Sequence, residues 1–186
     1  MPRQTRVRAR QYGKRRKELG IGEQHTDTKH LLCCDVYTEA IKPVNFAVTS
    51  SNISQIGYTG ESGEILVIPV AFQNEGVWYR VTSIGNYTFF RKSLVSVEIP
   101  DSVTSIGDYA FRSCNSLTSI EIPDSVTSIG AYAFSNCTSL TSINYDDTVE
   151  QWNAISKGYY WNNKTGSYAI YCTDGEIAKD GTVTYY

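Results

Sequence analysis

The sequence has little of what membrane proteins, secreted proteins and most enzymes need. It holds one methionine, five prolines and two histidines in 186 residues. No apolar stretch approaches the roughly 20 residues of a membrane-spanning helix. The basic N-terminus is followed by polar residues 18–30 instead of an apolar run, which argues against a signal peptide. We therefore expect no membrane span, and an assembly-associated (for example virion) or cytoplasmic location rather than classical secretion.

Catalytic and metal-binding signatures are also scarce. Both histidines, His25 and His30, lie near the N-terminus, so a Ser-His-acid or Cys-His triad would have to draw on that segment. Cys33 and Cys34 follow them, but the spacing matches no standard zinc pattern. The sequence contains no glycine-rich phosphate-binding loop. It therefore predicts no enzymatic activity, no metal site and no cofactor.

The five cysteines do not form the even set typical of a disulfide scaffold. Cys114 and Cys137 share one repeat position, one coil apart. They could form a disulfide if their side chains converge. The favoured interpretation is that they are free thiols buried as small hydrophobic side chains.

Charge is unevenly distributed along the chain. The formal net charge is −2, but residues 1–30 carry nine basic and three acidic side chains, and the rest carries eight basic and sixteen acidic ones. Such a basic arm on an acidic body suits nucleic acid, an acidic protein surface or an anionic membrane. Alone in water we expect the arm to be disordered. Its predicted anchoring residues are Arg3, Arg6, Arg8, Arg10, Lys14, Arg15, Arg16 and Lys17.

Two adjacent near-copies of a 23-residue unit dominate the remainder. Residues 102–124 read SVTSIGDYAFRSCNSLTSIEIPD and residues 125–147 read SVTSIGAYAFSNCTSLTSINYDD, identical at 16 of 23 positions. A fixed short period of this kind indicates a solenoid, in which each repeat forms one coil. Ile-Gly pairs recur at 84–85, 106–107 and 129–130. The first coil is one residue short before Leu94 and has no cysteine, which a terminal coil tolerates.

The pattern within one coil predicts its geometry. Leu117, Ile120 and Ile122 can point inward from a short strand that Pro123 ends, because proline donates no ladder hydrogen bond. Phe134, in a tight turn of the next coil, fills the interior. After residue 143 the sequence no longer follows the 23-residue pattern.

The predicted fold is mainly β. It is a short right-handed leucine-rich-repeat solenoid with an N-terminal β-hairpin cap and a C-terminal helix and strand cap, preceded by an extended basic arm. Short strands are expected at Val44–Val48, Ile53–Tyr58, Glu64–Ile68 and Val77–Arg80, then a helix at Thr148–Ser156 and strands at Tyr168–Thr173 and Thr182–Tyr186. The predicted divisions are arm 1–30, connector 31–45, hairpin cap and half-repeat 46–80, repeats 81–143, and C-terminal cap 144–186.

The repeats resemble the BspA-type leucine-rich repeats. Leu117 to Cys137 fits Leu-x-x-Ile-x-Ile-Pro-x-x-Val-x-x-Ile-Gly-x-x-Ala-Phe-x-x-Cys at every position, and the segment 148–177 is similar to the one that often follows the last repeat. The resemblance covers residues 45–186. It implies a binding protein without shared catalytic residues. Members are typically large, secreted or surface-attached and adhesive, whereas this chain has about three coils and a basic arm.

Repetition predicts ladders of like side chains, because outward positions of successive coils lie about 4.8 Å apart. These ladders are a candidate binding face for a protein or a glycan, although repeated sequence produces ladders in any case. They comprise Glu98, Glu121 and Asn144; Ser96, Ser119 and Ser142; Ser83, Ser105 and Ser128; and Tyr87, Tyr109 and Tyr132.

Three functions are open from the sequence. The favoured hypothesis is a non-enzymatic display or decoration module, anchored by the arm to a larger assembly such as a virion, with the solenoid facing outward. The alternatives are a bacterial surface adhesin module that binds host proteins, and a nucleic-acid-binding protein that uses the arm.

Overall fold

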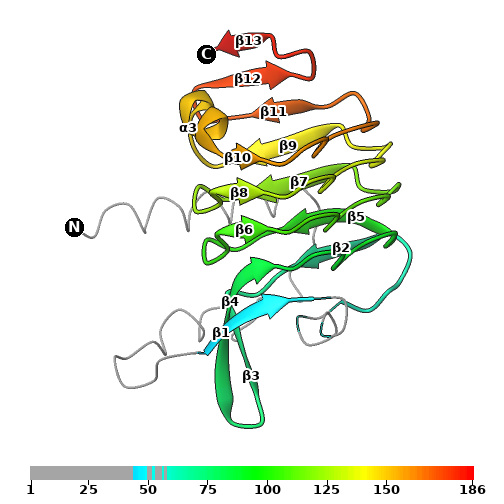
Figure 1. Cartoon of the computed structure of the whole chain (residues 1–186), viewed down its shortest axis with the longest axis vertical. Coiled ribbons are helices and arrows are strands. Elements are labelled where there is room, and N and C mark those ends of the chain that lie inside the picture. The colour runs from blue at the N-terminus through cyan, green and yellow to red at the C-terminus, as the bar shows by residue number, and fades with distance from the viewer. Residues whose placement is uncertain (1–43, 50–51, 53–55, 57) are drawn as a thin grey trace, which may run out of the picture. The chain divides into compact units, whose positions relative to one another are not determined.

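The computed structural model describes residues 44–49, 52, 56 and 58–186. These residues belong to one compact unit, in which short coils stack on one another (Figure 1). The predicted arm, and the connector up to residue 43, lie outside the described residues. No helix in the described part of the chain has the length and apolar character needed to cross a membrane.

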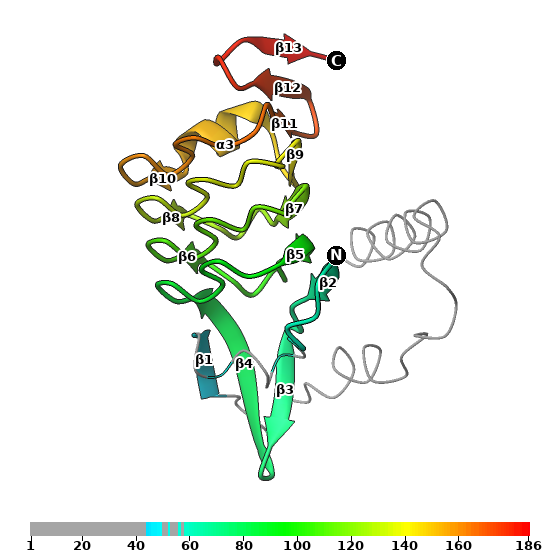
Figure 2. The ribbon, with the colours of Figure 1, turned by 90° about the vertical axis from the view of Figure 1, so that its right-hand side faces the viewer.

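Two sheets form the walls of the stack, and each coil contributes one strand to each (Figure 2). The first sheet runs in the order β1 (Val44–Val48), β4 (Val77–Ile84), β6 (Ser105–Ile106), β8 (Ser128–Ile129) and β10 (Ser156–Lys157). The second begins with β2 (Glu64–Val67), β5 (Leu94–Glu98), β7 (Ser119–Ile122), β9 (Ser142–Tyr145) and β11 (Ala169–Tyr171). Neighbours in these runs pair in parallel. The predicted mainly β solenoid is therefore confirmed.

The alternation of side chains explains why these short segments are strands. In β7, Ile120 and Ile122 are buried whereas Ser119 and Glu121 are half-buried. A period of two places the isoleucines inside and the polar side chains outside. Pro123 follows as predicted and ends the strand.

A third ladder of backbone hydrogen bonds runs along the corner between the two sheets. In the second coil, the N–H groups of Tyr109, Phe111 and Ser113 donate to carbonyl groups of the next coil at 2.9, 2.8 and 2.8 Å. The corresponding alternate residues link the first coil to the second and the third to the fourth. The corner is therefore as regular as the strands, and every coil is held to its neighbour along three strips.

Close stacking at this corner explains the repeated glycine. A Cβ atom on Gly130 would lie 2.5 Å from the backbone nitrogen of Asp108, and one on Gly107 would lie 2.7 Å from the nitrogen of Asn86. Backbone atoms held in a ladder cannot move aside, so only glycine fits. Gly158 meets the same restriction against Ala131, which shows that the coil geometry extends beyond residue 143.

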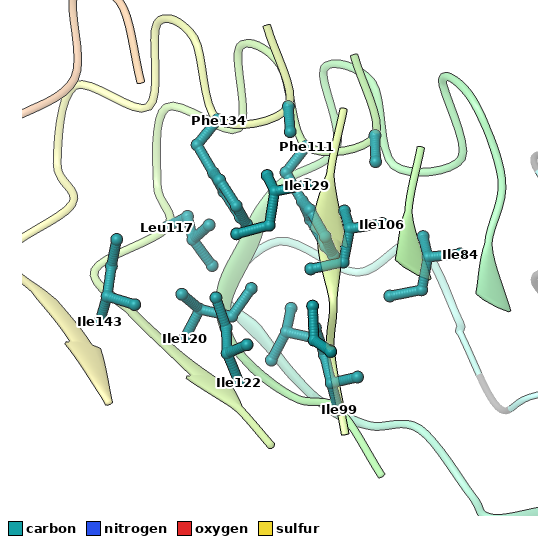
Figure 3. Packing of buried hydrophobic residues seen from close by; sticks show 14 of the residues in the cluster. Ile84, Ile99, Ile106, Phe111, Leu117, Ile120, Ile122, Ile129, Phe134 and Ile143 are labelled. Carbon is teal, nitrogen blue, oxygen red and sulfur yellow. The ribbon is translucent and has the colours of Figure 1, made fainter. Parts of the chain in front are cut away.

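Stacked side chains fill the interior (Figure 3). Phe89, Phe111 and Phe134 are fully buried and form a column with ring centroids 5.1 and 5.2 Å apart and interplanar angles of 13° and 4°. Isoleucine and leucine side chains from both sheets surround them. Identical residues at identical positions pack because the backbone repeat is close to the thickness of an aromatic contact.

The N-terminal end differs from the predicted hairpin cap. β1 pairs in parallel with β4, and β2 pairs in parallel with β5, so neither belongs to a hairpin. β2 does supply the strand of the predicted half-repeat. Of the predicted strand at 53–58, the described residues Ile56 and Tyr58 are not in a strand. Parallel partners are distant in sequence, and alternation alone cannot indicate which of them pair.

The hairpin lies later in the chain. β3 (Ala71–Asn74) pairs antiparallel with the first half of β4. The connecting residues Glu75 and Gly76 have φ values of 49° and 79°. Two left-handed residues in succession give the tight turn whose twist suits antiparallel strands.

The C-terminal end adds a helix and two antiparallel strands. α3 (Val149–Ala154) starts at Thr148, whose side chain accepts a hydrogen bond from the Gln151 N–H, and it buries Val149 and Trp152, which confirms the predicted helix. β12 (Gly175–Ala178) and β13 (Val183–Tyr185) extend the second sheet beyond β11. β12 was not expected, because Asp174–Gly175 resembles a turn.

Cys114 and Cys137 are free and buried, as predicted. Their thiols donate to the carbonyl groups of Phe89 and Phe111, each in the preceding coil, with sulfur–oxygen distances of 3.0 Å. Burial raises the pKa of Cys114 from 9.0 to about 12, and it raises the pKa of Cys137 further. Both thiols therefore stay protonated at neutral pH and serve as packing and hydrogen-bonding groups.

The phenylalanine column leads to a stability prediction. Phe111→Ala should lower the free energy of unfolding by about 3–5 kcal/mol, because it removes the middle ring of the column and leaves a cavity. Phe90→Ala, at the half-buried neighbour of the column, should cost less than half as much. Urea unfolding followed by circular dichroism measures both. Equal losses in the two variants would contradict the packing described.

The thiols lead to a prediction on pH. Their folded pKa values lie above the unfolded value of 9.0, so the stability they contribute is present below pH 9 and is lost as the pH rises toward 12. At pH 10 the loss should be about 1 kcal/mol per thiol relative to pH 8. Urea unfolding measures the free energy of unfolding at both pH values. Between pH 8 and pH 10 it should decline less in the Cys114→Ala/Cys137→Ala variant than in the unmodified chain. An identical decline would show that the thiols are not the cause.

Candidate functional site

Tyrosine side chains form a column along the corner of the solenoid. Tyr87, Tyr109 and Tyr132 occupy one repeat position, and Tyr160 occupies it in the fourth coil. We call these four residues the tyrosine column. Their φ values are 57°, 58°, 55° and 52°, in the left-handed region that bulky side chains rarely adopt. The predicted tyrosine ladder is thus a structural feature, one coil longer than the sequence indicated.

The first three rings of the tyrosine column stack face to face. The centroids of Tyr87 and Tyr109 are 4.7 Å apart and those of Tyr109 and Tyr132 are 5.1 Å apart, with interplanar angles of 5° and 7°. Tyr160 lies 5.7 Å from Tyr132 and is tilted by 60°. The end members Tyr87 and Tyr160 are 48% and 49% exposed. The column therefore presents a rigid aromatic edge to solvent.

A cation and a further tyrosine extend this surface. The guanidinium carbon of Arg112 lies 5.3 Å from the Tyr109 ring centroid and 5.7 Å from that of Tyr132. Its buried Nε atom has no hydrogen-bond partner among the residues that the structure describes. Tyr159, which is 66% exposed, lies 3.8 Å from Tyr160 between ring centroids. Its side-chain hydrogen bond with Tyr160 raises the pKa of Tyr159.

The backbone does not require tyrosine at these positions. Each coil has a second left-handed residue four positions later, and this one is chemically varied: Arg91, Ser113, Asn136 and Lys164, with φ values of 57°, 60°, 62° and 55°. Left-handed backbone favours glycine and asparagine over aromatic residues. The recurrence of tyrosine at the first position therefore reflects what its side chain does, namely stacking or binding.

Tyr160 was missed because two changes hide the fourth coil. The helix α3 is inserted in the chain between β9 and β10, so Gly158 follows Gly130 after 28 residues instead of 22 or 23. Lys157 also replaces the buried isoleucine at 84, 106 and 129, as its pairing with Ile129 shows. The remaining signal was Ser156-x-Gly158-x-Tyr160, which matches Ser-Ile-Gly-x-Tyr at every position except the isoleucine.

Lys157 ends the row of buried isoleucines at 84, 106 and 129, and backbone carbonyl groups satisfy its ammonium group. Its ammonium group donates to the carbonyl oxygens of Trp152 and Ile155 at the end of α3, and it lies 4.7 Å from the Trp152 ring centroid. Burial lowers the pKa of Lys157. Cations are favoured at helix C-termini, so this lysine joins the helix to the open end of the core.

The serine and glutamate ladders lie on the second sheet, on different elements from the tyrosine column. Ser96, Ser119 and Ser142 align in register, and the Ser119 hydroxyl donates to that of Ser96 at 3.0 Å. Glu98 aligns with Glu121, which aligns with Asn144. All six are half-buried. On the first sheet, Ser83, Ser105 and Ser128 also align, and Ser156 extends that row.

The structure describes only some of the other residues considered as metal ligands or binding residues. Among the described residues, no group of three or more histidine, cysteine or acidic side chains is placed to hold a metal ion. His25, His30, Cys33 and Cys34 lie outside the described residues, as do all eight anchoring residues of the arm. The tyrosine column is therefore the best-defined candidate binding surface.

Solved structures of leucine-rich repeat proteins are similar to this chain. One from Bacteroides ovatus is 28% identical (TM-score 0.46) and is matched over 56% of this chain and 26% of its own. One from Bacteroides capillosus is 29% identical (TM-score 0.48), over 57% of this chain and 74% of its own. The T. pallidum leucine-rich repeat protein is 33% identical (TM-score 0.39), over 47% and 43%.

The chain thus spans about a quarter of the length of the Bacteroides ovatus protein. A comparison with curated proteins finds no match. A family model described as the BspA type leucine-rich repeat region matches six copies over residues 79–171, which is half of the chain. This chain belongs to the BspA-type leucine-rich repeat family.

Proposed function

We propose that this chain is a non-enzymatic binding module whose tyrosine column docks a protein partner. The observation that carries the proposal is the recurrence of tyrosine at one strained backbone position in four coils, beside a varied second position of the same geometry. Backbone strain at repeated sites is retained where the side chain has a use. Leucine-rich repeat modules offer regular surfaces of this kind for binding.

The chemistry of the tyrosine column suits a protein surface. Tyrosine offers a large contact area with only two side-chain torsions to fix, and its hydroxyl can form hydrogen bonds at the edge of the contact. Stacking has already ordered Tyr109 and Tyr132, so little further entropy is lost on binding. Arg112 adds a guanidinium group held against both rings. Arginine and tyrosine together are typical of interface hot spots.

The competing interpretation is that the column only stabilises the solenoid. The end members separate the two roles, because Tyr87 and Tyr160 are about half exposed and the stacked pair Tyr109 and Tyr132 remains without them. A matched pair of exposed tyrosines, Tyr171 and Tyr185 at 41% and 66% exposure, lies on the C-terminal strands.

We expect Tyr87→Ser/Tyr160→Ser to weaken binding at least tenfold on an array of purified extracellular proteins, because the variant loses the exposed ends of the docking surface. Tyr171→Ser/Tyr185→Ser should bind like the unmodified chain. Thermal unfolding of both variants checks that folding is preserved. Equal binding by both variants, or no protein bound by the unmodified chain, would show that the column is structural.

We also propose that the basic arm anchors the module to a larger assembly, such as a virion, and leaves the solenoid free. The support is the charge asymmetry, with nine basic and three acidic residues in 1–30 against eight and sixteen in the rest. A surface adhesin and a nucleic-acid-binding protein are the alternatives. An adhesin would bind through the solenoid alone, and a nucleic-acid-binding protein would bind through the arm alone.

Deletion of residues 1–30 should abolish co-purification with the particle, because it removes the positive charge that docks on an acidic groove. Co-sedimentation at low and high salt measures the association. Continued co-sedimentation of the shortened chain would reject the docking role. Salt-sensitive retention of nucleic acid by the full chain alone would instead support the third hypothesis.

A further inference from the structure

The one-residue deletion in the first coil changes the corner turn that leads into the second sheet. The Lys92 N–H donates to the Phe89 carbonyl at 3.0 Å, as the Cys114 N–H does to the Phe111 carbonyl at 3.1 Å. Lys92 therefore occupies the position of the buried cysteine. Ser93 alone then precedes Leu94, where the second coil has two residues, Asn115 and Ser116, before its leucine.

The short turn creates a hollow beneath the longer turn of the second coil. A hollow of about 380 Å³, partly open to solvent, is lined by Arg91, Lys92, Ser93, Ser113, Asn115 and Ser116. These residues come from the shortened turn and from the turn stacked on it. Since the third coil has the full-length turn of the second, the hollow lies where the repeat departs from its regular length.

The lining is cationic and rich in hydrogen-bond donors. It contains an arginine and a lysine, four hydroxyl or amide side chains, and no carboxylate. Across the described part of the chain, no carboxylate forms a salt bridge with Arg91 or Lys92. Residues 31–186 hold twice as many acidic as basic side chains, so the hollow is a local positive site on an acidic body.

Aromatic contacts hold both cations in place. The guanidinium carbon of Arg91 lies 4.9 Å from the Phe90 ring centroid, and the ammonium nitrogen of Lys92 lies 5.6 Å from that of Tyr58. The Arg91 N–H donates to the Arg112 carbonyl at 2.9 Å, which joins the two turns. Charges that are ordered before binding lose less entropy when a ligand arrives.

We propose that this hollow binds a sulfated saccharide, with the sulfate at Arg91 and Lys92 and the sugar hydroxyls at the serine and asparagine side chains. The guanidinium fork suits an oxyanion with two or more acceptor oxygens. The volume lies at the lower end of ligand sites, about 300–1,000 Å³, and exceeds what one oxyanion needs. The polar lining favours a sugar over an apolar side chain of a peptide. The proposal does not depend on the tyrosine column.

The proposal is tested by titrating the full chain with N-acetylglucosamine-6-sulfate at constant ionic strength. Binding is monitored by ¹⁵N-edited NMR. The amide signals of Lys92, Ser93, Ser113 and Asn115 should shift. The sulfated sugar should bind at least tenfold more tightly than either N-acetylglucosamine or inorganic sulfate. Equal affinity for inorganic sulfate would reduce the hollow to a simple anion site. Equal affinity for the neutral sugar, or no shift at all, would also reject the proposal.

Variants locate the binding. Arg91→Gln should weaken it at least tenfold, because a hydrogen bond to a charged group is lost. Lys164→Gln is the matched control, since Lys164 is exposed and has the same left-handed position in the last coil, where the structure shows no such deletion. It should bind like the unmodified chain. A similar loss in both variants would indicate non-specific charge attraction.

An insertion tests the origin of the hollow while both charges are kept. An asparagine placed between Lys92 and Ser93 restores the turn length of the second coil, so it should fill the hollow and abolish binding. Unchanged shifts elsewhere in the NMR spectrum, together with thermal unfolding, check that the inserted chain folds. Undiminished binding by the folded insertion variant would overturn the proposal, and the Arg91→Gln comparison remains decisive if the variant does not fold.

Discussion

Backbone hydrogen bonds between successive coils are the constraint on which the rest of this structure depends. They run along both sheets and along the corner, where alternate N–H groups donate to the coil above at 2.7–3.1 Å. Because all three ladders share one spacing, each coil must place equivalent residues directly over one another. Glycine at 107, 130 and 158 is one result, since any Cβ there would meet backbone atoms. The stacked phenylalanine and tyrosine columns are another.

The same constraint makes departures from the repeat meaningful. A strained left-handed position that holds tyrosine in four coils points to a use for the side chain, because the neighbouring left-handed position accepts four different residues. A single deleted residue cannot be absorbed by sliding a coil, so it appears as a hollow between two turns. The inserted helix packs Val149 and Trp152 against the core, and Lys157 takes the isoleucine position beside it. The proposed ligand site therefore lies at an irregular point of the scaffold, whereas the tyrosine column follows the repeat itself.

Much of this arrangement could be predicted from the sequence, because a repeat carries its own register. The buried isoleucines, the free thiols and the first three members of the tyrosine column follow from the period. The helix at 149–154 lies beyond the predicted repeats and follows instead from the amphipathic pattern of Thr148–Ser156. The parallel pairing of β1 with β4 could not, since its partners are far apart in the chain and are chosen by packing. Tyr160 was hidden by Lys157 and the inserted helix. The hollow needs the spatial overlap of two turns, which no sequence pattern expresses.

Amide hydrogen exchange at the corner tests the central claim most directly, because the corner ladder distinguishes this account from one in which two sheets are joined by loops. The amides of Tyr109, Phe111, Ser113, Tyr132, Phe134 and Asn136 donate between coils. Native-state exchange should show them opening with the same free energy as the amides of β7, which is that of global unfolding. Exchange of these six amides at the rate of exposed loop residues, with β7 still protected, would contradict the account.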